Sequence, residues 1–305
     1  MKKYFYNLFF KKYQYKKLYM TGLSHILNAR INYSNIKYLS DVDYKIFSQN
    51  GEDGILDYLL YQLKIEKPKF MEIGVGDYSE SNTRFIFDRC SPKGIIVDCI
   101  DDFENKVKKN IQLWRGELKI IEKFVAPNNI NEIIQDNNLS KDLDIFSFDI
   151  DGIDYWVINE LPKNFSKIAV LEYNSIFGPD KKVTVPKIKN FNRKEYHYSC
   201  LCFGMSLNAA IDLMKKKNFY FLGTNMFRNN AFFISNEFDK ESHFKSLIIK
   251  DIKNIDEANF TESRNINGEL NYLHGKNKLN KISDCKVVDL NDGNLKKIKE
   301  IYNIN

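Results

Sequence analysis

The sequence lacks the features that mark membrane-spanning and secreted proteins. No stretch reaches the roughly 18 uninterrupted apolar residues that a transmembrane helix needs. The apolar stretch 4–10 follows two lysines, but it is short and no small-residue cleavage site follows it, so no signal peptide is expected. The five cysteines are odd in number and include no CxxC pair, which favours reduced thiols in a cytoplasmic protein.

Acidic residues are absent from the first 40 positions, which hold eight lysines and arginines. The whole chain has a formal net charge of +6, so the remaining 265 residues are slightly acidic. A body of this charge argues against a nucleic-acid-binding protein, and the basic segment predicts a local anionic partner. Eight of the first 20 residues are aromatic, although the lysines do not gather on one helical face. We therefore predict peripheral contact of residues 1–20 with the inner face of a membrane or with a lipid-linked substrate, the alternative being docking on the protein's own body or on a second subunit.

Three regions follow from the pattern of the chain. Residues 1–41 form a basic, aromatic and helical head, 42–238 form the main domain, and 239–305 form an accessory, partly helical extension. In the main domain helices alternate with strands, which indicates an α/β fold with a Rossmann-like, doubly wound and mostly parallel sheet. Two further strands close in sequence predict an antiparallel hairpin at the sheet edge. The expected strands are 69–73, 94–99, 118–125, 144–149 and 167–172, followed by the hairpin strands 218–222 and 230–234.

Helix starts and loops can be predicted as well. Asn50 is expected to cap a helix with Asp53 three residues on, as in a capping box, and Ser81 is expected to cap helix 82–90. The segment 173–200 contains Gly178-Pro179 and Pro186 and is expected to be irregular.

Carboxylates gather where the expected strands end. Glu72 ends the first strand, Asp98 the second, Asp149 the fourth and Glu172 the fifth, with Asp151 two residues beyond Asp149. In an open α/β sheet ligands bind beyond these strand ends, so the acids predict a site there. Helix capping is the alternative for any single one.

Two glycines follow Glu72, at positions 74 and 76, and they would let the backbone pass close under a ligand. The third glycine of the dinucleotide fingerprint is replaced by Ser79, which argues against a pyrophosphate cofactor. Asp98 lies where an acid accepts hydrogen bonds from ribose hydroxyls.

These residues resemble a known family. The segment Glu72–Gly76 followed by Asp98 resembles the cofactor-binding motif of class I S-adenosylmethionine-dependent methyltransferases. The segments 47–55 (FSQNGEDGI), 149–154 (DIDGID) and 172–174 (EYN) resemble the FkbM-type methyltransferases, with Asp151 where that family usually has glutamate. The resemblance covers about 42–238. It implies a Rossmann-like fold, S-adenosylmethionine as cofactor and methylation of a hydroxyl, often on a sugar or glycan such as a bacterial surface polysaccharide precursor.

The resemblance implies a set of cofactor-binding residues: Gln49, Glu52, Glu72, Gly74, Gly76, Asp98 and Asp149. Gln49 and Glu52 would close over the cofactor, Asp98 would bind the ribose, and Phe124 and Val125 would flank the adenine.

Methyl transfer to an alcohol also needs a base, for which Asp151 and His197 are the candidates. His197 is the histidine of the main domain, although a surface position in a loop is the favoured explanation for it. Asp149 and Asp151 could instead hold Mg²⁺ or Mn²⁺. Arg84 could bind an anionic group or pair with Asp88 one turn later.

Two other functions remain open. The DxD pattern of Asp149 and Asp151 also occurs in metal-dependent glycosyltransferases that use nucleotide sugars, and a non-catalytic scaffold at the membrane is the third possibility. The acceptor, the oligomeric state and the role of 239–305 are not predicted.

Overall fold

The computed structural model describes residues 36–137, 143–239 and 262–304, together with a few single positions: Tyr15, Tyr19, Gly22, Leu23, His25, Ile26, Tyr33, Phe244 and Leu247. The predicted contact of residues 1–20 with a membrane therefore falls almost entirely outside the described residues. Within the described parts of the chain, no helix has both the length and the apolar character to cross a membrane.

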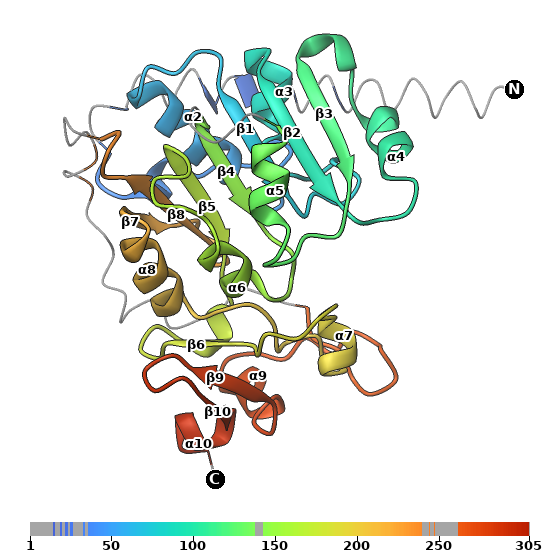
Figure 1. Cartoon of the computed structure of the whole chain (residues 1–305), viewed down its shortest axis with the longest axis vertical. Helices are drawn as coiled ribbons and strands as arrows, with labels where there is room; N and C mark the ends of the chain where they lie inside the picture. The colour runs from blue at the N-terminus through green and yellow to red at the C-terminus, as the bar shows by residue number, and fades with distance from the viewer. Residues whose placement is uncertain are drawn as a thin grey trace, which may run out of the picture.

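Seven strands of the described chain form one sheet, in the order β3-β2-β1-β4-β5-β8-β7 (Figure 1). Neighbouring strands from β3 to β5 run parallel, whereas β8 runs antiparallel to both β5 and β7. The predicted Rossmann-like sheet and its antiparallel hairpin are thus confirmed. The strands are β1 Lys69–Ile73, β2 Lys93–Asp98, β3 Glu117–Glu122, β4 Ile145–Phe148, β5 Ile168–Glu172, β7 Phe219–Thr224 and β8 Asn230–Ser235.

Both faces of the sheet are covered by helices, because alternate strand residues point to opposite faces. Phe70 and Ile145 belong to one buried cluster, and their chain neighbours Met71 and Phe146 belong to the other. The helices are α2 Glu52–Gln62, α3 Arg84–Cys90 and α4 Phe103–Asn110 on the first face and α5 Ile130–Gln135, α6 Asp154–Asn159 and α8 Leu207–Lys216 on the second. In Figure 1, α5 and α8 lie in front of the sheet. Short 3-10 helices lie at Leu39–Val42 (η2), Leu113–Arg115 (η3) and Ser175–Phe177 (η4).

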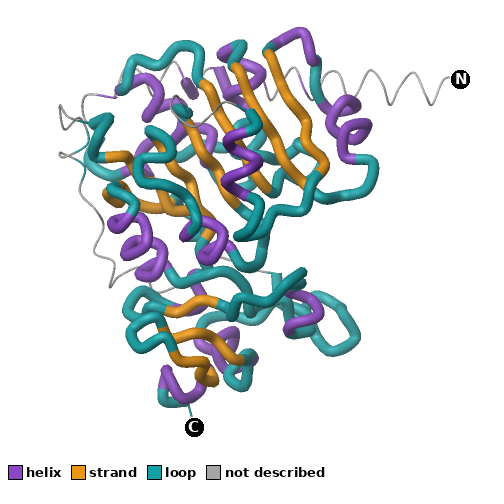
Figure 2. Tube along the Cα trace, viewed as in Figure 1, coloured by secondary structure: helices purple, strands orange, loops and turns teal. Residues whose placement is uncertain are grey.

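A second, smaller sheet lies beside the carboxyl ends of β1 to β5 (Figures 1 and 2). It has the order β10-β9-β6, with β6 at Val183–Thr184, β9 at Lys286–Asp289 and β10 at Asn294–Lys297. The short helices α7 Arg193–Tyr196, α9 Lys276–Lys281 and α10 Ile298–Tyr302 accompany it. The segment expected to be irregular therefore contains a strand and two short helical segments, η4 and α7. A two-residue strand has no pattern of its own, and β6 exists because β9, about 100 residues later, pairs with it.

The start of α2 differs from the expected capping box. Gly51, with φ +101°, occupies the N-cap position that the sequence assigned to Asn50. The buried carboxylate of Asp53 accepts hydrogen bonds from the backbone N–H groups of residues 46–48 instead of reaching back to the cap. Asp53 thus fixes the loop that precedes α2, and part of that loop borders the cavity described next.

Candidate functional site

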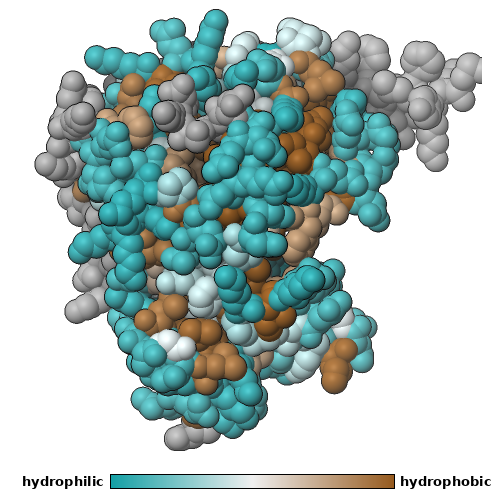
Figure 3. All heavy atoms as spheres, viewed as in Figure 1, coloured by the Kyte–Doolittle hydropathy of each residue, from teal (hydrophilic) through white to brown (hydrophobic). Residues whose placement is uncertain are grey.

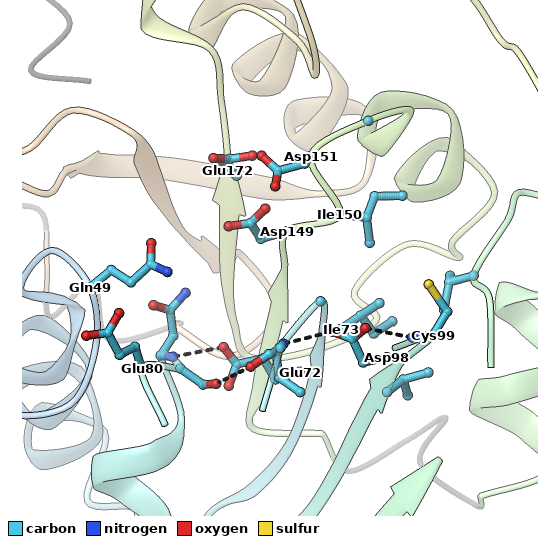
Figure 4. Close-up of a pocket in the computed structure, with 18 of the residues that line it drawn as sticks. Gln49, Glu72, Ile73, Glu80, Asp98, Cys99, Asp149, Ile150, Asp151 and Glu172 are labelled. Atoms are coloured by element: carbon cyan, nitrogen blue, oxygen red, sulfur yellow. Dashed lines mark hydrogen bonds between the residues drawn. The ribbon is translucent and has the colours of Figure 1, made fainter. Parts of the chain in front are cut away.

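A cavity of about 640 Å³ opens at the carboxyl ends of the strands (Figure 4). Its wall also includes Lys123, Phe124 and Val125 after β3 and Phe227 and Asn229 between β7 and β8. Most of the residues predicted to form the site meet here: Gln49, Glu72, Gly74, Gly76, Asp98, Asp149 and Asp151. The position agrees with the rule that ligands bind beyond the strand ends of an open α/β sheet.

Glu72, at the end of β1, stabilises the turn that leads into α3. Its buried carboxylate accepts hydrogen bonds from the backbone N–H groups of Asn82 (2.8 Å) and Thr83 (2.9 Å) and from the Thr83 hydroxyl. Burial nevertheless raises the pKa of Glu72. The expected cap was wrong in its residue, since Thr83 is the N-cap and the Ser81 hydroxyl donates to the carbonyl of Val75. A carboxyl group of the protein therefore already accepts hydrogen bonds from N–H groups that would otherwise be free to bind a phosphate.

The two glycines after Glu72 have different roles. A Cβ at Gly74, where φ is +81°, would lie 1.5 Å from the carbonyl oxygen of Asp149, so this glycine makes room for the neighbouring strand end. A Cβ at Gly76, where φ is +56°, would meet nothing within 4 Å. The expectation that both glycines make room for a ligand therefore fits Gly76, whereas Gly74 is required by the packing of β1 against β4.

Asp98 joins the end of β2 to the glycine turn (Figure 4). One carboxylate oxygen accepts a hydrogen bond from the N–H of Gly76 at 2.8 Å, and the other accepts from the N–H groups of Cys99 and Ile100 at 2.7 and 3.1 Å. The carboxylate is fixed in this orientation at the cavity wall. Each carboxylate oxygen has two lone pairs, so Asp98 retains the capacity to accept hydrogen bonds from a ligand.

Three carboxylates meet at the ends of β4 and β5. Asp149, Asp151 and Glu172 each offer an oxygen, and these oxygens lie within 4.8 Å of one another (Figure 4). Burial raises the pKa of all three, and the negative charge of the neighbouring acids raises those of Asp149 and Glu172 further. The cluster thus keeps protons that separate carboxylates would lose, and a cation placed there would release them. Glu172 was noted at a strand end in the sequence, but only the pairing of β4 with β5 brings it beside Asp149.

An arginine that the sequence did not predict covers this acidic cluster. Arg193 of α7 contacts Asp151 at 2.5 Å and Glu262 at 2.8 Å, and its guanidinium lies over the ring of Phe203. Asp151 itself has a positive φ of 53°, which is uncommon for a residue other than glycine. The three charged residues come from segments up to 111 positions apart, so no local sequence signal joins them.

The turn that carries Asp151 is held from within. The buried carboxylate of Asp154 accepts hydrogen bonds from the N–H groups of Ile150 at 3.1 Å and Gly152 at 2.8 Å. Burial raises the pKa of Asp154 to about 6. Phe191 packs over Gly152, where an added Cβ would lie 3.1 Å from the ring. The DIDGID segment is therefore a compact turn that places Asp149 and Asp151 at the cavity.

Two predicted site residues do not line the cavity. His197 contacts the hydroxyl of Ser199 through Nδ1 at 2.7 Å and stacks on Tyr198, and burial lowers its pKa. Its position corrects the expectation that it serves as a base, because a base must reach the reacting proton. Glu52 is fully buried and accepts hydrogen bonds from the side-chain amides of Asn225 and Asn230 at 2.7 and 2.8 Å. It holds α2 against the β7–β8 hairpin and does not close over a cofactor.

The alternative roles of Arg84 are also settled by its contacts. The guanidinium lies 3.4 Å from Asp88 and donates to the carbonyl oxygens of Tyr78 and Asn110. Arg84 does not line the cavity. It is therefore a structural residue that connects α3 to the loop before it and to the last residue of α4.

Comparison with known proteins supplies no family for this chain: no protein-family description matches it, and no curated protein is similar to it. Among solved structures, it is similar to a candidate sarcosine dimethylglycine methyltransferase from Galdieria sulphuraria, at 14% identity and a TM-score of 0.37 over 56% of this chain and 60% of that one. It is also similar to the N-terminal domain of EvdMO1, determined in the presence of SAH and D-fucose, at 8% identity and a TM-score of 0.35 over 58% of this chain and 77% of that one. The chain thus spans less than two thirds of the first of these proteins. The class of fold, a doubly wound Rossmann-like sheet, rests on the strand order itself.

Proposed function

We propose that the protein is an S-adenosylmethionine-dependent methyltransferase. The observation that carries this proposal is the carboxylate of Glu72 on the N-terminus of α3. In dinucleotide-binding folds that helix end attracts a pyrophosphate, whereas here an internal carboxyl group already accepts the hydrogen bonds of its N–H groups. A cavity with acids at its base and rim favours a cationic ligand, and S-adenosylmethionine carries a sulfonium and an ammonium group. The volume of about 640 Å³ is within the range of small-molecule sites.

The other residues of the cavity suit the remaining parts of such a cofactor. Asp98 presents a fixed carboxylate, and the acceptor site that its three backbone hydrogen bonds leave open can accept a hydrogen bond from a ribose hydroxyl. Gly76 leaves open space above the turn that precedes α3. Phe124, which is 42% exposed, and Val125 offer apolar contact for an adenine ring. These roles match the ones that the resemblance implies.

The acceptor in this proposal is a hydroxyl of a sugar or glycan, and it binds on the side of the cavity formed by Asp149, Asp151 and Glu172. Carboxylates can hold sugar hydroxyls and can accept the proton that is lost on methylation. The ion pair with Arg193 holds Asp151 in place, and Asp151 is the base in this proposal. The sugar class, a place in surface-glycan synthesis and a lipid-linked acceptor at the inner face of a membrane come from the resemblance alone.

Binding of S-adenosylhomocysteine tests the cofactor. Isothermal titration calorimetry of the full chain should show binding of S-adenosylhomocysteine and no binding of NAD⁺. Asp98→Asn should weaken the affinity at least about tenfold, because hydrogen bonds to a charged acceptor contribute about 1.5–3 kcal/mol. The matched control is Asp180→Asn, an exposed aspartate outside the cavity, which should bind as the wild type does. Absence of heat at millimolar S-adenosylhomocysteine would reject the proposal.

The acidic cluster favours a second candidate, a metal-dependent glycosyltransferase. Three carboxylates suit a hard cation such as Mg²⁺ or Mn²⁺, which would orient and acidify an acceptor hydroxyl or hold a nucleotide diphosphate. Thermal unfolding separates the candidates. Stabilisation by Mn²⁺ together with a nucleotide sugar, abolished in Glu172→Gln and accompanied by no response to S-adenosylhomocysteine, favours the glycosyltransferase. No response to any of these ligands leaves the non-catalytic scaffold.

A further inference from the structure

The segment 262–275, which we call the arm, projects beside α7 and exposes apolar side chains. Ile266 is 79% exposed, Leu270 is 44% exposed and Tyr272 is 56% exposed. In Figures 1 and 3 the loop that precedes α9 extends from the lower right of the molecule, and Figure 3 shows hydrophobic atoms at that projection. Single exposed apolar residues are common on proteins, but three within seven positions of one projecting hairpin are not scattered.

Hydrogen bonds give the arm a defined shape. The chain reverses between Arg264 and Leu270, which form a β-bridge. The Asn265 side chain accepts from the N–H groups of Asn267 and Glu269, and its backbone N–H donates to the carbonyl of Glu269. The folded protein thus holds Ile266 on an ordered turn in contact with water. Exposure of an aliphatic side chain forgoes the free energy that its burial would contribute.

The base of the arm is fixed to the body of the protein. Ser263 is fully buried, and its hydroxyl contacts Asn271 and accepts from the N–H of Leu273. Glu262 pairs with Arg193 at 2.8 Å, and Arg193 pairs with Asp151 in the cavity. These contacts fix the position of the arm relative to the cavity. A surface that binds the arm is therefore held at a fixed distance from the cavity.

Positive charge exceeds negative charge near the apolar residues. From 262 to 281 the chain has four lysines and arginines against two acids, one of which is Glu269 on the turn of the arm. Exposed lysines lie on both neighbouring helices: Lys194 on α7, and Lys276 and Lys281 on α9. Among the described residues Lys194 and Lys276 have no ion-pair partner, and the ammonium of Lys281 lies 5.3 Å from the centre of the Tyr198 ring. Glu195 is exposed beside Lys194, so the positive charge offered to an anionic surface is mainly that of α9.

We propose that the arm inserts Ile266 and Leu270 into an anionic lipid surface, with Tyr272 at the interface and the lysines of α7 and α9 against the headgroups. From the acyl chains outward, a bilayer accommodates aliphatic side chains, then amphipathic rings at the interface, and then cations among the headgroups. A second copy of the chain fits less well, because three side chains on a projecting turn offer far less than the roughly 800 Å² per partner of a stable interface. The proposal concerns the location of the protein in the cell, so it holds whether the cavity serves a methyltransferase or a glycosyltransferase.

Vesicle binding of the full chain tests the arm. We expect the protein to co-sediment with vesicles of equal parts phosphatidylcholine and phosphatidylglycerol. The double variant Ile266→Ser with Leu270→Ser should partition at least about tenfold less, because each aliphatic side chain contributes about 1.5–3 kcal/mol on burial. The matched control is Leu295→Ser, since Leu295 lies on β10 and is 52% exposed. It should partition as the wild type does. Lys276→Gln should lower partitioning about fivefold.

A second measurement distinguishes the arm from residues 1–20, which could also bind lipid. Ile266→Trp should be quenched by brominated lipids, whereas Leu295→Trp should not be quenched. No quenching at position 266, or equal partitioning of the double variant and the wild type, overturns the proposal. A dimer in solution that the double variant dissociates also overturns it, in favour of a second copy. The variants should bind S-adenosylhomocysteine as the wild type does, so failure of that binding in every protein counts against the cofactor and not against the arm.

Discussion

Replacing Gly74 with alanine should damage the protein far more than the same change at Gly76. Both glycines have a positive φ, of 81° and 56°, so an alanine at either position is strained by about 1–2 kcal/mol. They differ in what the new methyl group meets. At Gly76 it meets nothing within 4 Å, whereas at Gly74 it would lie 1.5 Å from the carbonyl oxygen of Asp149 and 2.6 Å from its carbonyl carbon.

The cost at Gly74 follows from the backbone that must move. The ends of β1 and β4 have to separate, and the hydrogen bond from the Asp149 N–H to the carbonyl of Ile73, now 3.0 Å, is then lost. A lost hydrogen bond between buried groups costs about 1–3 kcal/mol, and the separation also loosens the packing around it. We expect a decrease of about 4 kcal/mol or more in the free energy of unfolding for Gly74→Ala, against about 1–2 kcal/mol for Gly76→Ala.

Urea unfolding of the two variants and the wild type measures both values, provided that the slope of the free energy with urea stays constant. Calorimetry with S-adenosylhomocysteine then separates stability from binding. Because the movement displaces Asp149 from the cavity, Gly74→Ala should also lose ligand affinity when it remains folded. If the free energies of unfolding of the two variants differ by less than about 1 kcal/mol, the close approach of Gly74 to Asp149 is not a feature of the folded protein.

Three further changes have definite expected outcomes. Glu72→Gln should lower the free energy of unfolding by about 1–3 kcal/mol in urea, because one amide oxygen cannot satisfy the buried donors of α3. His197→Ala should leave the affinity for S-adenosylhomocysteine within about twofold by calorimetry, since the side chain lies outside the cavity; a larger loss would restore a role for it. The pKa of Asp154 rises from its ordinary 3.8 to about 6 on burial, so the folded state keeps this proton longer than the unfolded state. The contribution of Asp154 to stability therefore falls by about 3 kcal/mol as pH rises from about 3 to 7, and unfolding of Asp154→Asn followed across this range should lack that decrease.

Much of the main domain could be predicted because its signals are local. The strand at 69–73 is a short apolar run before a glycine, and β1 has these bounds in the structure. The helix after residue 50 was predicted from apolar spacing, and α2 buries Ile55, Leu56 and Leu59 as that spacing requires. The caps were predicted less well. Gly51 begins α2 without a side-chain cap while Asp53 binds the preceding loop, and at α3 the carboxyl group of Glu72 on β1 accepts the hydrogen bonds that a local cap was expected to accept; propensity does not describe such contacts.

The site shows the same division. The acids at the strand ends were predicted because a parallel sheet places the carboxyl ends of its strands at one edge, and Asp98, Asp149 and Asp151 do line one cavity. Glu52 was implied by the family resemblance and His197 was chosen by its place in the chain, and both side chains make other contacts. Arg193 and Glu262 were missed because the contact between them joins the main domain to a segment 69 residues later.

The sequence by itself determined the alternation of helices and strands, the doubly wound sheet and the edge at which its carboxylates gather. These follow from periodicity, from glycine and proline positions and from the handedness of strand connections, all of which are local properties. Only the tertiary structure decided which carboxylates share protons, that Arg193 covers Asp151, that Gly74 serves the packing of β4, and that the arm presents Ile266 beside the cavity. Such features depend on contacts between residues far apart in the chain, and the free energy of those contacts is set by burial and distance in the folded protein.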